Sequence, residues 1–302
     1  MGYDLIRAKL ARGETIILDG GTGTDIQRRG AAMSGDTWCA DANLTSPDIV
    51  RDVHKDYVAC GADIITANPF ATSPLLFSHI GRAADVNRID AIAVKLAQEA
   101  VAGTNVCVAG SMSTMRPMQT GSDRNNLAHE WSEADARALF RMKANGLKAA
   151  GVDLIMMEMM RDTDYSLWAS EAAMETGLPV WIGISVERAD GELKGFGRND
   201  QRLADVAPAL AALEPAAMSI MHTSPNETDE ALTMLRQYYA GPIGAYPECG
   251  YFKAPNWVFV DTIAPDDLAA KCRDWQALGA TFFGGCCGIG PEHIGCLHGP
   301  GH

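Results

Sequence analysis

Two adjacent cysteines near the C-terminus are the strongest chemical signal in this chain. They belong to the stretch Phe282-Phe283-Gly284-Gly285-Cys286-Cys287-Gly288. Neighbouring cysteines seldom form a disulfide with each other, because the short ring strains the peptide between them. The glycines let the backbone turn and aim both sulfurs at one point, where paired thiolates favour zinc over magnesium or calcium. Cys286 and Cys287 are therefore interpreted as metal ligands, and the alternative is a pair of buried thiols that only fill the core.

The elements that must position these cysteines follow one repeated pattern. Eight short apolar runs have the near-continuous hydrophobicity that is typical of parallel strands covered on both faces. Amphipathic segments at 133–150, 163–176 and 265–278 separate several of them and predict helices. The predicted strands are 16–19, 62–66, 106–110, 152–156, 180–184, 217–221, 242–246 and 280–283, and the glycines expected to cap helices are Gly61, Gly151, Gly177 and Gly279.

Eight β/α units in about 300 residues predict a (β/α)8 TIM-type barrel, in the α/β class. No linker or composition break divides the chain, so residues 1–302 are expected to form a single domain. The competing architecture is an open doubly wound sheet. The dinucleotide-binding form of that sheet needs a Gly-x-Gly-x-x-Gly motif after the first strand, and the segment 19–24 lacks both this motif and the lysine of a P-loop.

In such a barrel the catalytic groups lie at the C-terminal ends of the strands, where the loops converge. Several polar residues fall at these ends, although each has a structural alternative: Asp19 could cap a turn, and Glu158 could pair with Arg161. A lone His222 would be a hydrogen-bonded structural residue, but beside two thiols it is favoured as a metal ligand. The residues at the strand ends are Asp19, Asn68, Glu158, His222, Tyr246, Glu248, Cys286 and Cys287.

Composition excludes several classes of function. The chain has 302 residues, 47 % of them hydrophobic, which is enough for a substantial core. Its net charge of -13 and the absence of a basic cluster argue against a nucleic-acid partner. No apolar run approaches the ~20 residues that span a bilayer, so no membrane partner is expected. Eight scattered cysteines without a disulfide framework fit a reducing cytoplasm.

These motifs resemble those of the zinc-dependent homocysteine S-methyltransferases, a family that includes the betaine-homocysteine and S-methylmethionine-homocysteine enzymes. Asp19-Gly20-Gly21 is similar to the family's first-strand motif, and Thr66-Ala67-Asn68-Pro69-Phe70 to its second-strand end. The segment 284–288, followed by Pro291-Glu292-His293-Ile294, matches its closing signature. The resemblance covers nearly the whole chain and implies a (β/α)8 barrel.

The resemblance also implies a substrate site. Trp38 matches an aromatic residue that lines the methyl-donor pocket. Glu158 stands where a carboxylate binds the amino group of homocysteine together with Asp19. The other substrate-binding residues expected from it are Gly20, Gly21, Asn68, Phe70 and Tyr246.

The chain departs from the family at the expected third zinc ligand. Where the family has a cysteine at the end of the sixth strand, this chain has His222, so the implied Zn²⁺ ligands are His222, Cys286 and Cys287. A neutral imidazole in place of a thiolate makes the centre one unit less negative, and a bound substrate thiolate should be a poorer nucleophile. Glu248 and Cys249, in a stretch that also departs from the family, are possible additional ligands.

The expected reaction moves a methyl group from a sulfonium or quaternary ammonium donor to a thiol, with homocysteine as the acceptor and methionine as the product. Zinc deprotonates and holds the thiol. Trp38, with Phe70, can hold the donor's positive charge through a cation–π contact of ~0.5–2 kcal/mol. The methionine-rich segment 111–121 lacks the family's glycine-rich sequence, which leaves the identity of the donor open.

Two other classes of function remain as alternatives. One is a hydrolase or lyase of the same fold that uses zinc to activate water, with Glu158 as the base. The other is a non-catalytic zinc-binding relative that lost methyl transfer with its third cysteine. The sequence leaves the oligomeric state undetermined.

Overall fold

The computed structural model describes residues 2–298 and is built around eight parallel strands. They are β1 (Ile16–Ile17), β2 (Ile64–Thr66), β3 (Cys107–Ser113), β4 (Leu154–Met160), β5 (Val180–Ile184), β9 (Ala217–Met221), β10 (Ile243–Tyr246) and β13 (Ala280–Phe283). Their order in the sheet is β1, β13, β10, β9, β5, β4, β3, β2. The sheet closes on itself because Asp19 N donates to Ile64 O at 3.1 Å and Asp63 N donates to Ile17 O at 2.7 Å. The expected (β/α)8 barrel is confirmed.

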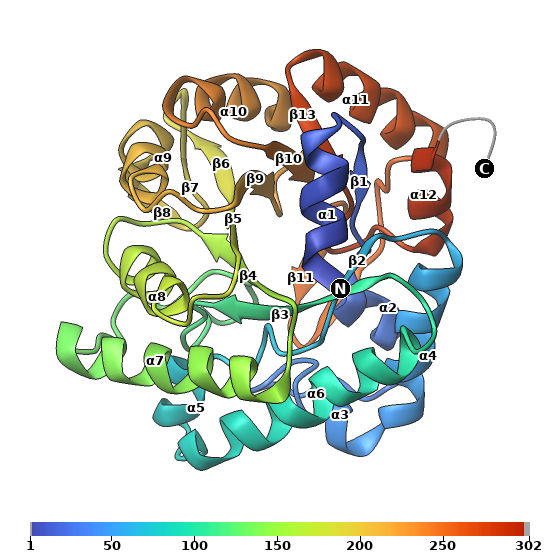
Figure 1. Ribbon diagram of the computed structural model, residues 1–302. Helices are drawn as coiled ribbons and strands as arrows, with labels where there is room; N and C mark the ends of the chain where they lie inside the picture. Colours follow the sequence, from blue (N-terminus) through green and yellow to red (C-terminus); the bar gives the residue numbers. More distant parts are fainter. Residues whose placement is uncertain (1, 299–302) are drawn as a thin grey trace.

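Helices surround the barrel and follow its strands in turn, as Figure 1 shows. Among residues 2–298, no helix is both long and apolar enough to cross a bilayer. The helices are α1 (Gly2–Ala11), α2 (Thr22–Arg28), α3 (Ala42–Thr45), α4 (Pro47–Ala59), α5 (Pro74–His79), α6 (Val86–Ala100), α7 (Glu133–Ala150), α8 (Tyr165–Met174), α9 (Leu203–Ala211), α10 (Pro225–Tyr238), α11 (Pro265–Ala277) and α12 (Pro291–Gly295), with short 3-10 turns at Ala83–Asp85 and Cys296–His298.

The elements form where the sequence pattern places them. Ser132 caps the start of α7 by accepting a hydrogen bond from Asp135 N, and Gly151 ends the helix in the left-handed conformation with φ of 87°. Gly61, Gly177 and Gly279 also have positive φ, at 89°, 74° and 92°, each just after a helix. The predicted strand boundaries agree within a few residues, and both β3 and β4 extend further toward the site than expected.

The N-terminal helix α1 covers the N-terminal end of the barrel. Figure 1 shows it, in dark blue, lying across the ring of strands. Ile6 of this helix packs into the barrel interior with Leu154 and Phe282, and all three are buried. Trp181 Nε1 donates a hydrogen bond of 2.9 Å to Tyr3 Oη. The opposite end, where the strands finish, is therefore the one available for a site.

Two antiparallel insertions at the C-terminal end of the barrel were not expected from the sequence. After β5 the chain forms a three-stranded sheet of β6 (Val186–Ala189), β7 (Glu192–Gly195) and β8 (Arg198–Arg202). After β10 it forms a hairpin of β11 (Tyr251–Lys253) and β12 (Asn256–Val258). Both insertions add residues to the surroundings of the site.

Candidate metal and substrate site

A cavity lies at the C-terminal ends of the barrel strands. It gathers eleven of the residues that the sequence marked as candidates, while Glu248 and Cys249 are outside its lining. The eleven are Asp19, Gly20, Gly21, Trp38, Asn68, Phe70, Glu158, His222, Tyr246, Cys286 and Cys287.

His222, Cys286 and Cys287 come together with the spacing of a metal site. The Cys286 and Cys287 sulfurs are 4.0 Å apart, and Cys286 Sγ is 3.4 Å from His222 Nδ1. Tetrahedral zinc, with Zn–S of about 2.3 Å and Zn–N of about 2.0 Å, would separate two sulfurs by about 3.8 Å and a sulfur from a nitrogen by about 3.5 Å. The three ligand atoms therefore fit a single zinc ion.

The charges in this group are arranged as they would be for a cation. The pKa of Cys286 is lowered because Cys287 donates a hydrogen bond to it and His222 lies beside it, whereas the pKa of Cys287 is raised. Burial alone would keep His222 neutral, but Glu248, Cys286 and Asp123 together raise its pKa well above 6.5. These shifts favour a thiolate on Cys286 beside a protonated His222, and a metal ion bound by the two residues would replace that proton.

The far side of the His222 ring faces two carboxylates. His222 Nε2 is 3.3 Å from Glu248 Oε2 and 3.5 Å from Asp123 Oδ2. Glu248 therefore lies beyond the imidazole rather than in the group with the two sulfurs. Cys249 is turned away: its sulfur packs in the core between the strands and helices, and its backbone N donates to Cys287 O at 2.9 Å. Among the described residues, Cys249 belongs to no group with metal-ligand spacing.

Glycines let the ends of the first and last strands, β1 and β13, approach closely, which brings Asp19 near Cys286. A side chain at Gly21 would place its Cβ 2.5 Å from Cys286 O, and one at Gly284 would be 2.6 Å from Leu18 Cβ. Gly285 N donates to Asp19 O at 3.0 Å. Only glycine permits this approach, so Asp19 and Cys286 share one cavity.

Asp19 and Glu158 are carboxyl groups at the strand ends, Asp19 buried and Glu158 half-buried. Burial raises the pKa of Asp19 to about 7, although its Oδ2 accepts a hydrogen bond of 2.6 Å from Thr66 N. Burial also raises the pKa of Glu158 to about 8, and the charges of Cys286 and Asp19 add to the effect. Glu158 accepts a hydrogen bond from Ser111 Oγ, so the alternative in which it pairs with Arg161 is not what the structure shows.

Aromatic rings form one wall of the cavity. The ring of Trp38 meets that of Phe70 edge-on at 6.2 Å and that of Phe252, from β11, at 6.3 Å. Trp257, from β12, packs against the His222 ring at 5.9 Å. The wall presents several ring faces and edges close to the metal-ligand group.

Three residues of the cavity lining have strained backbone. Trp38, Met159 and His222 have φ of 47°, 56° and 44°, a region that side chains other than glycine rarely adopt. Such strain costs of order 1–3 kcal/mol per residue and gathers where a side chain must be aimed for function.

The site residues that the sequence analysis did not identify include Ser111, Asp123, Phe252 and Trp257. Asp123 follows the methionine-rich loop, where no periodicity marks a position. Phe252 and Trp257 lie in a hairpin that the turn Ala254-Pro255 and its flanking aromatics could have indicated. Asn68, in contrast, was identified, and it accepts from Cys39 Sγ at 3.2 Å and donates to Cys39 O at 3.2 Å.

Comparisons with known proteins agree with this geometry. The homocysteine S-methyltransferase of Escherichia coli (strain K12) is 28 % identical over 97 % of this chain and 97 % of its own length. Betaine–homocysteine S-methyltransferase 1 of Xenopus tropicalis is 24 % identical over 94 % of this chain and 72 % of its own. The crystal structure of the homocysteine methyltransferase MmuM from Escherichia coli, metallated form, has a TM-score of 0.76 and 25 % identity, covering 97 % of this chain and 98 % of that one.

A family model described as homocysteine S-methyltransferase matches residues 16–299. The match extends from the first barrel strand past the paired cysteines, so it covers every residue of the cavity lining. The resemblance noted in the sequence is confirmed: the chain belongs to the homocysteine S-methyltransferase family and is an S-methyltransferase.

Proposed function

We propose that this protein is a zinc-dependent methyltransferase that moves a methyl group from a sulfonium or quaternary ammonium donor to the thiol of homocysteine, giving methionine. The observation that carries the proposal is the group formed by His222, Cys286 and Cys287, whose ligand atoms lie within 4.8 Å of one another. Two sulfurs and one nitrogen suit zinc and leave a fourth position for a substrate sulfur. When bound there, zinc would keep the acceptor as a thiolate at neutral pH.

Asp19 and Glu158 are proposed to bind the ammonium group of the acceptor. An ammonium between the two carboxyls favours their ionised forms, which offsets the cost of burial that raises the pKa of each. Ser111 holds Glu158 by a hydrogen bond, and Thr66 holds Asp19. The acceptor is thereby anchored at its amino end beside the metal-ligand group.

The aromatic wall is proposed to hold the donor. Trp38, Phe70 and Phe252 present ring surfaces that attract an onium cation, each contact contributing ~0.5–2 kcal/mol. The acceptor sulfur then forms a bond to the methyl carbon while the donor's bond to that carbon breaks. The electron pair stays on the donor atom, which leaves as a neutral thioether or amine. The thiol proton of the acceptor is released on binding, before this step.

The acidic residues behind His222 bear on how reactive the centre is. A histidine ligand is a weaker electron donor than a thiolate, but a carboxylate at its second nitrogen makes the ring more basic. Glu248 and, at slightly longer range, Asp123 occupy that position. We infer that these carboxylates restore part of the negative charge that is lost when a cysteine is replaced by His222.

Metal analysis combined with a transfer assay tests the proposal. The purified protein is expected to contain about one zinc per chain, and the Cys286→Ala, Cys287→Ala double variant should lose it. The intact protein should form methionine from homocysteine with at least one onium donor. Full zinc retention in the double variant, or no transfer from any sulfonium or quaternary ammonium donor, would contradict the proposal.

A further inference from the structure

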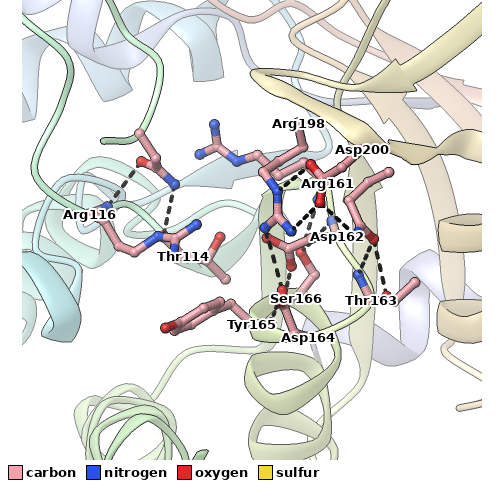
Figure 2. Close-up of polar contacts among 12 residues, drawn as sticks. Thr114, Arg116, Arg161, Asp162, Thr163, Asp164, Tyr165, Ser166, Arg198 and Asp200 are labelled. Carbon is pink, nitrogen blue, oxygen red and sulfur yellow. Dashed lines mark hydrogen bonds and ion pairs between the residues drawn. The ribbon is translucent and has the colours of Figure 1, made fainter. Parts of the chain in front are cut away.

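Three arginines gather around the loop that follows β4: Arg116, Arg161 and Arg198 (Figure 2). Arg198 is fully engaged with acidic partners. Its Nη1 is 2.7 Å from Asp162 Oδ2, and its Nε is 3.0 Å from Asp200 Oδ1. The second oxygen of Asp162 accepts a hydrogen bond from the backbone N of Ser166 at 2.7 Å. Asp162 and Asp200 are therefore already bonded to Arg198 and to the backbone of Ser166, so they have few acceptor positions left for the other two arginines.

Arg161 has no such partner. Its one hydrogen bond through the guanidinium is a long one, from Nη1 to Phe196 O at 3.4 Å. Its Nε is buried without a hydrogen-bond partner among residues 2–298, and no carboxylate in that range lies within ion-pair distance of it. The residue as a whole is 2 % exposed. A buried guanidinium in this condition is costly unless a ligand supplies the missing charge.

The backbone holds Arg161 in place even though its guanidinium lacks a partner. Its N donates to Ser166 Oγ at 2.9 Å. A side chain at Gly195 would approach Arg161 O to 1.9 Å, so β7 packs directly against this peptide. Met159, two residues earlier at the end of the same strand, has a positive φ of 56° that further limits the path of the chain. The fold therefore fixes the backbone of Arg161, and its side chain lines the cavity.

Arg116 increases the local positive charge. Its guanidinium stacks over the Tyr165 ring at 4.3 Å, and its Nε and Nη2 are buried without a partner within the described range. Burial lowers the pKa of Arg161 to about 10, with Asp162 opposing the shift and the neighbouring charge of Arg116 adding to it. Arg161 therefore stays protonated at neutral pH. Two buried cations thus lie close together while the nearby acids are bound to Arg198 or His222.

Arg161 lines the substrate cavity, whereas Arg116 and Arg198 do not. Its electrostatic neighbours are Asp162, Arg116, Asp123 and Arg198. Those of Glu158 are Cys286, Asp19 and His222, a set that shares no member with the first. Arg161 also contacts the antiparallel insertion after β5 through Phe196 O, whereas Glu158 is hydrogen-bonded to Ser111 of β3, so the two side chains have different surroundings in the cavity.

We propose that Arg161 is a binding residue for a carboxylate carried by the methyl donor, so that the donor is a zwitterion held by its cation on the aromatic wall and by its anion on this guanidinium. The inference rests on the proposed methyl transfer. A planar guanidinium matches a carboxylate with two parallel hydrogen bonds, and a buried pair of this kind discriminates strongly against analogues that lack the anion. The donor carboxylate supplies the negative partner that the Arg161 guanidinium lacks in the folded protein.

The first experiment measures binding without methyl transfer. Thermal unfolding of the wild-type protein and of Arg161→Met is followed under three conditions: without ligand, with dimethylsulfoniopropionate, and with dimethylpropylsulfonium. In the last compound a methyl group replaces the carboxylate. Without ligand, Arg161→Met should be as stable as wild type or more so, because it removes a buried charge that has no partner. Dimethylsulfoniopropionate should raise the wild-type Tm more than dimethylpropylsulfonium does. This difference between the two compounds should vanish in Arg161→Met.

The second experiment compares kcat/KM for the same two sulfonium donors, with homocysteine as the acceptor. Wild type should favour the carboxylated donor by roughly 10- to 100-fold, the range expected for a hydrogen-bonded charge, and Arg161→Met should lose that preference. Arg161→Lys should retain part of it, since lysine keeps the charge but not the planar fork. Arg188→Gln, which removes an arginine that pairs with Glu230 outside the cavity, serves as the control and should retain the full preference.

A third arm separates the donor's carboxylate from the acceptor's. Homocysteine is compared with 3-aminopropanethiol, which lacks only the carboxylate. If Arg161→Met abolishes the preference for homocysteine and leaves the donor preference intact, the guanidinium binds the acceptor and the proposal is overturned. An unchanged donor preference in Arg161→Met, or a large loss of ligand-free stability, also overturns it. If wild type transfers no methyl group at all, the proposed function fails, and the unfolding experiment alone decides whether Arg161 binds the carboxylate.

Discussion

His222 makes contacts on both sides of its ring, and each side bears on the metal site. Nδ1 faces Cys286 at 3.4 Å, and Nε2 faces Glu248 at 3.3 Å. A ligand oriented in this way depends on the group behind it, which fixes the ring and increases its basicity. The positive φ of His222 shows that the backbone is held in a strained conformation to present the ring.

Replacing Glu248 tests this dependence. Glu248→Gln should keep the zinc site but weaken zinc binding by roughly 10- to 100-fold, because the histidine loses its anionic partner. Competition with a chromophoric chelator measures the change. Glu230→Gln, which removes an exposed carboxylate on α10, is the control and should bind zinc as wild type does. Equal zinc affinity in all three proteins would show that Glu248 has no part in the site.

Glu158 allows a second test at the same scale. Glu158→Gln removes a charge that is expected to bind the acceptor's ammonium, so KM for homocysteine should rise at least tenfold while KM for the donor changes little, a loss of roughly 1.5–3 kcal/mol. Steady-state kinetics with each substrate varied in turn measures both constants. A similar rise in both values, or in neither, would contradict the assignment of Glu158 to the acceptor.

At the scale of elements, a buried ion pair holds the loop after β2. Lys143 of α7 and Asp90 of α6 are both fully buried, with Nζ 2.9 Å from Oδ2. Lys143 also donates to Pro69 O at 3.0 Å and to Thr72 Oγ1 at 2.9 Å. Helices α6 and α7 thereby hold in place the segment that carries Asn68 and Phe70 to the cavity.

Lys143→Met should cost about 3–5 kcal/mol of unfolding free energy, because it leaves Asp90 buried without a partner. Denaturation by urea measures the loss. The double variant Lys143→Met, Asp90→Leu removes both charges and should recover most of the stability. If the single variant were as stable as wild type, the pair would not hold these elements together.

The sequence was informative about elements wherever periodicity was strong. Helix α7 has the predicted bounds of 133 and 150, and β5, β9 and β13 also have the predicted bounds, since continuous apolar runs and capping glycines mark them. The three-stranded insertion was missed because β8 is Arg-Asn-Asp-Gln-Arg, whose polar residues carry no strand signal. The hairpin that carries Phe252 was missed for a different reason, because its two strands have only three residues each and alternate too briefly to stand out, although the Ala254-Pro255 turn could have indicated it.

Site residues that depend on long-range packing were also beyond the sequence. Asp123 meets His222 only because a loop of irregular structure folds back over the barrel. The structural alternative in which Glu158 pairs with Arg161 is not what the structure shows, since Glu158 accepts from Ser111 Oγ and Arg161 donates to Phe196 O. The extent of the domain, residues 1–302, and the roles assigned to the site residues stay predictions.

At the scale of the whole molecule, the buried carboxyls make stability depend on pH. Burial raises the pKa of Glu158 from 4.5 to about 8, so the folded state binds this proton more tightly than the unfolded state. Its contribution is fully present below pH ~4.5 and is lost as the pH rises through about 8. The metal-free protein should therefore lose stability over this range.

Replacing Glu158 by Gln should remove part of the stability loss that the metal-free protein shows as the pH rises. Between pH 5 and 8.5, the unfolding free energy of the metal-free wild type should fall relative to the variant by roughly 3–5 kcal/mol. Urea denaturation at both values, after treatment with a chelator, measures the difference. Asp19 titrates in both proteins, so its own burial cancels in the comparison, and only its repulsion of ionised Glu158 is included in the difference. Parallel pH profiles for the two proteins would show that Glu158 is not buried in this way.

Helix α1 determines at which end of the barrel substrates can enter and products can leave. Because it covers the N-terminal end of the barrel, we expect the acceptor, the donor and both products to enter and leave at the C-terminal end, where the two antiparallel insertions lie. Of the carboxyls that are proposed to hold the acceptor, Asp19 is buried and Glu158 is half-buried at the strand ends, while the aromatic wall includes Phe252 of the outer hairpin. If the acceptor binds beneath the donor, homocysteine should bind first and methionine should leave last, so we expect methionine to inhibit competitively against homocysteine and not against the donor.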